Sequence, residues 1–243
     1  MNTILVVAKS PVPGLAKTRL GPELTPHQCA ALAAAALLDT LDVALDVAEA
    51  RVVVAITGSL DDAPAGRQIA ATLRHCTVIG QRGSSFGERL AHAHRDAAGP
   101  FGPIVQIGMD TPQITTELLR QAFFELDAGS DAAIGATEDG GWWALALRHA
   151  GHARVLSGVP MSTPETYQAT SAAVRGLDLA TAQLPRLVDV DTVVDAATVA
   201  ELIPDTRFGQ LAALLLDAAG VHSSAVHSSA VHSSAPVMAG VQR

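Results

Sequence analysis

The amino-acid sequence predicts one three-layer α/β domain over residues 1–219, with a mixed sheet whose strands are mostly parallel. Apolar β-rich runs alternate with helical patterns as far as residue 147, the order in which helices cover both faces of such a sheet. The hydrophobic fraction is 49% and aromatic residues are only 3%, so the core must consist of Ala, Val, Leu and Ile. A chain of 243 residues fits one domain, since cores split beyond about 250–300 residues.

The first part of the chain contains three predicted strands and two predicted helices. Ile4 to Ala8 is a continuous apolar run, which is typical of a strand buried on both faces. Thr25-Pro26 predicts a helix start, because Thr caps helices and Pro suits the first helical position. We expect that helix to reach about Glu49. A strand, a helix and a second strand follow, over 51–57, 62–75 and 76–79.

The middle of the chain continues the alternation. A helix is predicted from Glu88 to about Ala97, and Thr115 is expected to cap another that ends near Asp127. His92 and His94 do not share a helical face, because they are two residues apart, and we expect both at the surface. Strands are predicted over 103–107, 131–136 and 142–147.

Beyond Arg148 the pattern weakens. One helix is predicted after Thr163-Pro164. A short strand is predicted over 187–190, a helix from about 195, and a final helix over 206–219. Residues 221–235 are three copies of Val-His-Ser-Ser-Ala. Five-residue spacing does not hold His on one helical face, so we expect a disordered tail over 220–243 and not a metal site.

Composition excludes several classes of function. The net charge of -8 and the scarcity of aromatic residues argue against nucleic-acid binding and against an anionic membrane surface. The N-terminal segment lacks the features of a signal peptide, and the small-residue run at 30–38 is too short to span a bilayer. We therefore expect a cytoplasmic protein. The apolar helix that includes this run would serve either a homodimer or only the core.

The loop after the first strand carries cations that no packing argument requires. Lys9, Lys17 and Arg19 stand in Ala-Lys-Ser-Pro-Val-Pro-Gly-Leu-Ala-Lys-Thr-Arg-Leu, which also contains Gly14. Ligands of open α/β sheets bind at the carboxyl ends of strands, and Arg and Lys are suited to phosphate. The loop is not a P-loop, because Ala16 stands where the second glycine belongs. We expect it to bind phosphate.

Acidic residues follow three of the later strands. Asp110 lies in Gly-Met-Asp-Thr-Pro, and a carboxylate at a strand end beside a cationic loop can hold a divalent metal against phosphates. Asp189 and Asp191 would project to the same side of a strand and repel each other unless a cation lies between them. The alternatives are a turn residue for Asp110 and a helix cap for Asp191.

Three further segments are candidates for substrate contact. In Glu138-Asp139-Gly140-Gly141, two glycines after two acids indicate a tight turn near a ligand, with Asp139 as a metal ligand or acceptor-activating base. Trp142 and Trp143 follow, either as pocket walls or as core. The helix start at Gly87-Glu88-Arg89 could attract an anion with its amides. Ser162-Thr163-Pro164-Glu165 resembles a capping box and could also touch a substrate.

These motifs occur together in an order that resembles a known family. AKSPVPGLAKTRL, FGERL, GMDTP, EDGGWW, STPET and DVDTVVD, over about residues 3–210, resemble the DUF2064 family, whose members are provisionally assigned as glycosyltransferases with a Rossmann-like GT-A fold. The KTRL and DVDT segments are also similar to phospholactate or phosphoenolpyruvate guanylyltransferases. The literal Asp-x-Asp lies at 189–191 and not at 108–110, where familiar glycosyltransferases carry it.

The resemblance implies a metal-dependent transferase that uses a nucleotide-activated donor, most simply a nucleotide sugar, and a small-molecule acceptor. It implies that Asp110, Asp189 and Asp191 hold Mg²⁺ or Mn²⁺ and that Lys17 and Arg19 bind the phosphates. Asp139 or Glu138 would orient or deprotonate the acceptor, beside a surface formed by Gly140, Gly141, Trp142, Ser162 and Thr163. The alternatives are a nucleotidyltransferase that consumes a nucleoside triphosphate and releases pyrophosphate, and a non-catalytic nucleotide-binding protein.

Overall fold

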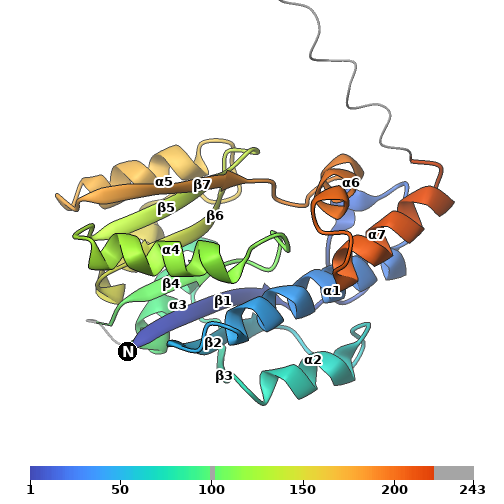
Figure 1. Ribbon diagram of the computed structural model, residues 1–243, viewed down its shortest axis with the longest axis horizontal. Coiled ribbons are helices and arrows are strands. Elements are labelled where there is room, and N and C mark those ends of the chain that lie inside the picture. The colour runs from blue at the N-terminus through green and yellow to red at the C-terminus, as the bar shows by residue number, and fades with distance from the viewer. Residues whose placement is uncertain (99–101, 222–243) are drawn as a thin grey trace, which may run out of the picture.

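The computed structural model describes residues 1–98 and 102–221, which form one seven-stranded sheet between helices (Figure 1). The strand order is β3-β2-β1-β4-β6-β5-β7. Only β6 runs antiparallel to its neighbours, β4 and β5, so the predicted mixed and mostly parallel sheet is confirmed. The strands are β1 Asn2–Lys9, β2 Ala50–Thr57, β3 Thr77–Gly80, β4 Ile104–Ile107, β5 Ala132–Thr137, β6 Trp142–Leu147 and β7 Thr181–Leu187.

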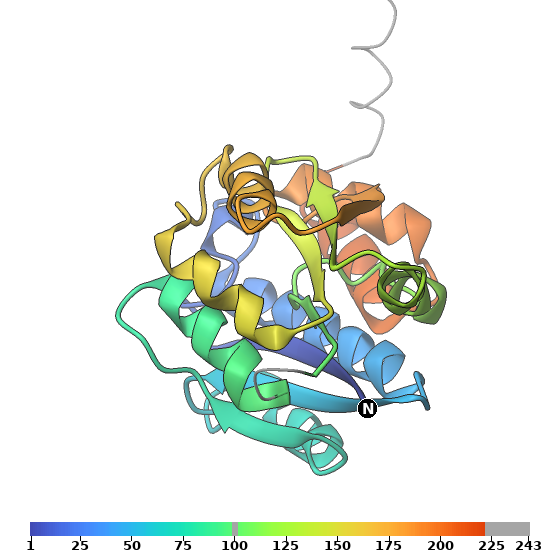
Figure 2. The same cartoon turned by 90° about the vertical axis from the view of Figure 1, so that its left-hand side faces the viewer.

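Helices cover both faces of the sheet, as Figure 2 shows in a view turned by 90°. One face packs against α1 (Pro26–Leu45), α2 (Gly66–Leu73) and α4 (Thr116–Asp127). The other packs against α3 (Phe86–Ala98), the 3-10 helix η2 (Ala150–Gly158) and α5 (Thr166–Arg175). A third apolar cluster joins α1 to α6 (Val193–Leu202) and α7 (Arg207–Ala218), which lie together at one end of the molecule.

Helix α1 is the longest helix of the described chain, and its start was correctly predicted. Thr25 accepts a hydrogen bond from Gln28 N, and the Gln28 side chain accepts one from Thr25 N, which completes a capping box. The helix ends at Leu45, before the expected Glu49. By length and composition α1 could span a membrane, but 72% of its most apolar window is buried inside the structure, as expected of a core helix.

Two predicted elements are displaced. Helix α2 begins at Gly66 and not at Asp62, because Ala65 adopts a left-handed backbone conformation that a right-handed helix cannot include. The last strand covers Thr181–Leu187, whereas residues 187–190 were predicted. This strand lies at the edge of the sheet, where proline, which has no N–H to donate, is tolerated at position 185. Only Leu184 in it is buried, so the strand lacks the apolar pattern of a central strand.

The prediction that His94 lies at the surface is wrong. His94 is fully buried between α3 and β4, where its Nε2 lies 2.7 Å from Oε1 of Gln106. Burial lowers the pKa of His94 to about 4, against a weaker opposing effect of the hydrogen bond to Gln106. The imidazole is therefore neutral at physiological pH and serves the packing of α3 on the sheet.

The order of the strands creates a switch point beside β1. The chain runs from β1 outward through β2 and β3, then returns to place β4 on the opposite side of β1. The parallel strands β1 and β4 therefore direct their carboxyl ends, and the loops that follow, to the same edge of the sheet. Ligands bind at such switch points in open α/β sheets. The predicted disordered tail over 220–243 lies, except for its first two residues, outside the described residues.

Candidate functional site

The cationic loop after β1 delivers Lys17 to the edge of the sheet. Turns within the loop are closed by backbone hydrogen bonds from Leu15 N and Ala16 N to Val12 O. Lys17 itself has a left-handed backbone, with φ of 49°, a conformation that a non-glycine residue adopts at a cost and that is frequent at functional sites. Leu20, fully buried in the cluster with α6 and α7, anchors the end of the loop.

Lys17 joins two loops that are far apart in the sequence. Its Nζ lies 2.7 Å from Oδ1 of Asp110 and 3.4 Å from Oδ1 of Asp191, and it also donates to Val190 O. Burial alone would lower the pKa of Lys17, but Asp110, Asp189 and Asp191 outweigh burial and raise it. Lys17 is therefore a permanently charged group with only 9% of its side chain exposed.

The loop over residues 188–191 is held beside the end of β4 by main-chain contacts. Val190 N donates to Asp110 O at 2.9 Å, and the Gln113 side chain donates to Val188 O at 2.6 Å. Arg19 Nη1 lies 2.8 Å from Oδ2 of Asp191 on the exposed side. Asp189 and Asp191 thus meet the cationic loop, although they do so from a loop and not from the strand that the sequence predicted.

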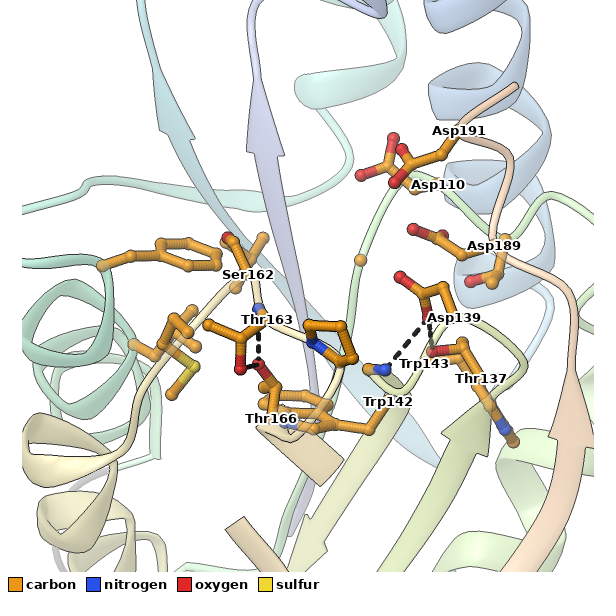
Figure 3. A pocket seen from close by; sticks show the side chains of 18 of the residues that line it. Asp110, Thr137, Asp139, Trp142, Trp143, Ser162, Thr163, Thr166, Asp189 and Asp191 are labelled. Atoms are coloured by element: carbon orange, nitrogen blue, oxygen red, sulfur yellow. Dashed lines mark hydrogen bonds between the residues drawn. The ribbon is translucent and has the colours of Figure 1, made fainter. Parts of the chain in front are cut away.

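Asp189 is surrounded by three other acidic residues, Asp110, Asp191 and Asp139. Burial, then the charges of Asp110, Asp191 and Asp139, raise the pKa of Asp189 to about 8, against the opposing effect of Lys17. Oxygen atoms of Asp139, Asp189 and Asp191 all lie within 4.8 Å of one another. Figure 3 shows Asp191, Asp110, Asp189 and Asp139 in one column along the wall of a cavity.

The turn between β5 and β6 positions Asp139. Oδ1 of Asp139 accepts hydrogen bonds from Thr137 Oγ1 at 2.5 Å and Gly141 N at 3.0 Å, which fix the carboxylate (Figure 3). Gly140 has φ of 89°, and a Cβ there would lie 2.0 Å from Pro164 O, so only glycine allows this close approach. Asp139 therefore lies with Asp189 and Asp191, the position that its role as a metal ligand requires; the sequence left that role and an acceptor-activating role open.

Two cavities open at this edge of the sheet and share a border. The first has a volume of about 540 Å³ and contains Asp139 and Asp189 in its wall, and the second has about 440 Å³ and contains Lys9, Lys17 and Arg89. Residues that line both cavities are Val7, Arg19, Phe86, Asp110, Ser162 and Asp191. The carboxylates and cations thus lie where two bound molecules would meet.

The first cavity is bordered by the residues that the sequence suggested for an acceptor. Trp142 lines it and donates from Nε1 to Thr170 Oγ1 at 3.1 Å, whereas Trp143 also reaches it but is 2% exposed and belongs to the core. Ser162 and Thr163 line it as well, with Ser162 in a left-handed conformation. They do not form the expected capping box, because α5 begins at Thr166 after an N-cap Glu165 without a side-chain cap.

Several predicted site residues have structural partners or lie outside the two cavities. The Glu88 carboxylate accepts hydrogen bonds from Ser84 N and Ser84 Oγ, which lower the pKa of Glu88, and Glu88 N donates to Ser85 Oγ at the start of α3. Gly87 is buried, and a Cβ on it would lie 2.1 Å from Leu156 O. Gly14 and Glu138 are exposed and line neither of the two cavities. Lys9 lines the second cavity and donates to Leu15 O at 2.9 Å.

Other lining residues were not among the predicted site residues. Gln81 follows β3 and Gln106 lies within β4, and neither belongs to a motif. Phe86 borders both cavities and is 39% exposed, and the Arg89 guanidinium lies 5.3 Å from the centre of its ring. Phe86 opens the FGERL segment that contributes to the family resemblance, but the sequence indicated no role for Phe86 itself.

The family comparison covers the centre of the chain. Residues 40–163 match the model of a family described as "Uncharacterized protein conserved in bacteria (DUF2064)". The matched segment includes Asp110 and the turn at Asp139 but not the cationic loop or the 188–191 loop. No curated protein matches the chain.

Solved structures share the fold. A Desulfovibrio desulfuricans G20 protein, provisionally described as a nucleotide-diphospho-sugar transferase, is 28% identical, with a TM-score of 0.77 and coverage of 90% of this chain and 96% of that one. CMP:2-keto-3-deoxy-manno-octonic acid synthetase with CTP is 14% identical, with a TM-score of 0.54 and coverage of 84% and 98%. 4-Diphosphocytidyl-2C-methyl-D-erythritol synthase is 16% identical, with a TM-score of 0.52 and coverage of 83% and 97%. The expected GT-A-type α/β/α fold is confirmed.

Proposed function

The chain belongs to the DUF2064 family, and from that premise we propose that it is a metal-dependent transferase acting on a nucleotide-activated donor, in the first place a nucleotide sugar. One observation carries the proposal. Lys17 and Arg19 contact the acids Asp110 and Asp191 at the common border of two cavities. A donor in one cavity and an acceptor in the other would meet at this border.

The acids fit a hard divalent cation. Four carboxyl groups, of Asp110, Asp139, Asp189 and Asp191, face two cations, Lys17 and Arg19, so acidic groups outnumber cations even though Asp189 is protonated at neutral pH before a metal binds. Mg²⁺ and Mn²⁺ prefer carboxylate oxygen ligands. In this proposal Asp139, Asp189 and Asp191 hold the ion, with Asp110 beside them. A bound Mg²⁺ or Mn²⁺ would neutralise the negative charge of the donor diphosphate.

The cations of the chain supply the remaining electrostatic stabilisation. Lys17 is rigid and permanently charged, so it can stabilise negative charge that develops on the leaving phosphate without reorganisation. Arg19 is more exposed and lies at the mouth, where it can follow the phosphates of the donor. We assign the second cavity, with its cations, to the nucleotide and the first, with Trp142, Ser162 and Thr163, to the acceptor.

Nucleotidyl transfer is the second candidate, and the position of the acids supports it. The strand-end motif contains Asp110 alone, within Gly-Met-Asp, and not an Asp-x-Asp. In this case the acceptor would attack the α-phosphorus of a nucleoside triphosphate, the nucleotidyl group would be transferred to the acceptor, and pyrophosphate would leave. The provisional description of the Desulfovibrio desulfuricans protein favours a nucleotide sugar, and cytidylyltransferase relatives of the fold are compatible with a triphosphate.

Product analysis separates the two candidates. The protein is incubated with Mg²⁺ or Mn²⁺, a panel of nucleotide sugars or nucleoside triphosphates, and small hydroxyl and phosphate acceptors. A released nucleoside diphosphate indicates glycosyl transfer, whereas released pyrophosphate indicates nucleotidyl transfer.

The variant Asp110→Asn tests whether the turnover measured in this way depends on the acidic site. It should abolish turnover with the fold retained by circular dichroism, and Asp62→Asn, on an exposed loop before α2, should not affect turnover. Nucleotide binding without metal dependence and without turnover would instead identify a non-catalytic nucleotide-binding protein.

A further inference from the structure

Gln81 is held in one orientation at the edge of the sheet. Its Nε2 donates to the carbonyl oxygens of Ala8, at 2.8 Å, and Ala55, at 2.9 Å. Carbonyl oxygens only accept hydrogen bonds, so both must face the amide NH₂, and the side chain cannot be flipped. Oε1 is therefore the polar atom that remains, and it accepts no hydrogen bond within residues 1–98 and 102–221.

The two carbonyl groups belong to rigid parts of the fold. Ala8 lies in β1 and Ala55 in the neighbouring strand β2, and both residues are buried. Gln81 lines the second cavity directly after β3, the strand next to β2. The acceptor atom is thus fixed before any ligand binds, which lowers the entropic cost of recognition.

The chemistry of Oε1 excludes phosphate at this end of the cavity. Phosphate oxygens are acceptors and would gain nothing from a second acceptor. Lys17, Arg19 and Arg89 line the same cavity and are the groups suited to phosphate. A nucleotide in the cavity therefore has its phosphates at the cations and a hydrogen-bond donor at Gln81.

The walls of the second cavity suit a planar ring. Phe86 and Leu15 both line it and are among the large apolar side chains that remain exposed. The Arg89 guanidinium, 5.3 Å from the ring centre, packs over Phe86. Aromatic and guanidinium groups are common stacking partners of bases, and few aromatic residues occur in this chain.

We propose that Gln81 recognises the base of the bound nucleotide by accepting a hydrogen bond at Oε1 from a base N–H group, with the ring beside Phe86. The inference rests on the proposed nucleotide donor and adds to it a residue that contacts the base. Binding strength then depends on a base N–H in the plane of the Gln81 amide.

The test uses isothermal titration with the full chain and Mg²⁺. ATP, CTP, GTP and UTP are compared with inorganic tripolyphosphate, which has no base. Gln81→Leu should weaken the best-bound nucleoside triphosphate about 10- to 100-fold, the range for a bound base N–H group left without its hydrogen-bond acceptor. Tripolyphosphate affinity should change less than about twofold, because it involves only the cations and the metal.

A second variant separates recognition from structural support. Gln81→Lys can still donate to the carbonyl groups of Ala8 and Ala55 but offers no acceptor, so it should lose the preferred base while it keeps tripolyphosphate binding. Gln68→Leu, exposed on α2 and outside both cavities, is the matched control and should match the wild type.

The ligand can be varied in the same way. Methylation of the base N–H should weaken binding to the wild type and not to Gln81→Leu, whereas removal of the ribose hydroxyls should leave the Gln81→Leu effect unchanged. The role of Gln81 in base recognition would be wrong if the loss of affinity in Gln81→Leu depended on the ribose hydroxyls, or if nucleotide and tripolyphosphate lost affinity equally. Either result would leave the proposed function standing. Failure of every nucleotide and of tripolyphosphate to bind would overturn the proposed function as well.

Discussion

At the scale of the residue, burial changes what ordinary charged groups do. Lys17 is almost fully buried and Asp189 is half-buried in the wall of the first cavity, and their pKa values move for different reasons. Neighbouring carboxylates, Asp110 first among them, hold Lys17 charged, whereas burial and neighbouring acids favour the neutral form of Asp189. Asp189 therefore carries a proton in the metal-free protein that a cation would have to displace.

The first prediction concerns the pH dependence of metal binding. Because the pKa of Asp189 is raised to about 8, the carboxyl group is protonated below that pH, and metal affinity should fall as pH falls. The expected decrease is up to about tenfold per pH unit, with a plateau above about pH 8. Mn²⁺ titrations at several pH values measure it. Asp189→Asn should bind Mn²⁺ weakly at every pH, and an unchanged profile in this variant would assign the titration to another group.

The same carboxyl group has a consequence for stability. Its folded-state pKa lies above its ordinary value of 3.8, so the folded protein binds more protons than the unfolded chain between about pH 4 and 8. The contribution of Asp189 to the free energy of unfolding therefore falls as pH rises through this window. Relative to the wild type without metal, Asp189→Asn should show a smaller loss of stability over this range in urea denaturation.

At the scale of the element, the turn between β5 and β6 is fixed by contact with the segment before α5. Tyr167 N donates to Gly140 O at 2.8 Å, and Gly140 closely approaches Pro164 O. The turn therefore sets the distance between Asp139 and the first-cavity residues Ser162 and Thr163. This is why a hairpin and a helix start, remote in sequence, form one wall of the cavity.

Gly140→Ala should displace this wall. The new Cβ would lie 2.0 Å from Pro164 O and the positive φ adds strain, so we expect a loss of about 1–3 kcal/mol in unfolding free energy and a marked loss of turnover. Gly129→Ala is the matched control, because φ is also positive there, at 120°, but no atom lies within 4 Å of a Cβ. Equal effects of the two changes would show that backbone strain, and not the contact, explains the loss.

A second element-scale feature anchors α7 to α1. Asp39, 6% exposed, accepts from Arg207 Nη1 at 2.9 Å and from Phe208 N at 2.8 Å, while the exposed Asp42 accepts from the same guanidinium at 2.7 Å. These bonds meet at the start of α7. Phe208, buried beside them, connects this corner to the cluster that anchors the cationic loop at Leu20.

Asp39→Ala should lower the free energy of unfolding by about 2–4 kcal/mol, because it leaves the Phe208 amide and part of the Arg207 guanidinium without a partner. Asp42→Ala, at the other partner of Arg207, should cost less than about 1 kcal/mol because that pair is exposed to water. Chemical denaturation compares the two variants. Equal losses would contradict the importance that we attribute to burial.

At the scale of the whole molecule, the sheet brings four distant segments to one edge. The loops after β1 and β4 meet at the switch point, and the turn after β5 and the loop after β7 complete the site. Two apolar layers cover the sheet and hold these loops at fixed separation. The two cavities are therefore properties of the fold and not of one motif.

Metal and nucleotide should stabilise this arrangement together. A ligand that binds only the folded state raises the melting temperature, and a ligand at 100 times its dissociation constant adds about 2.7 kcal/mol. We expect nucleotide and Mg²⁺ or Mn²⁺ together to raise the melting temperature by more than the sum of the shifts that nucleotide alone and metal alone produce. Asp189→Asn should remove this excess, and a strictly additive wild-type response would place metal and nucleotide at independent sites.

The sequence by itself determined the layers of the fold and the residue types of the site. Apolar runs and helix caps such as Thr25 depend on local chemistry, so most elements could be read directly from the chain. The cations after β1 and the acids at Asp110 and Asp189 stand out for the same reason, because charged residues at strand ends serve no purpose in packing.

Only the tertiary structure decided which of these groups meet. The edge strand β7 lacks an apolar period, since it gains its partner from β5 and not from its own pattern, and so its limits could not be predicted. His94 and Gln81 carry no local signal, because their environments consist of residues far along the chain. The approach of Asp139 to Asp189 and the shared border of the two cavities arise from strand order, which brings distant loops together at one edge.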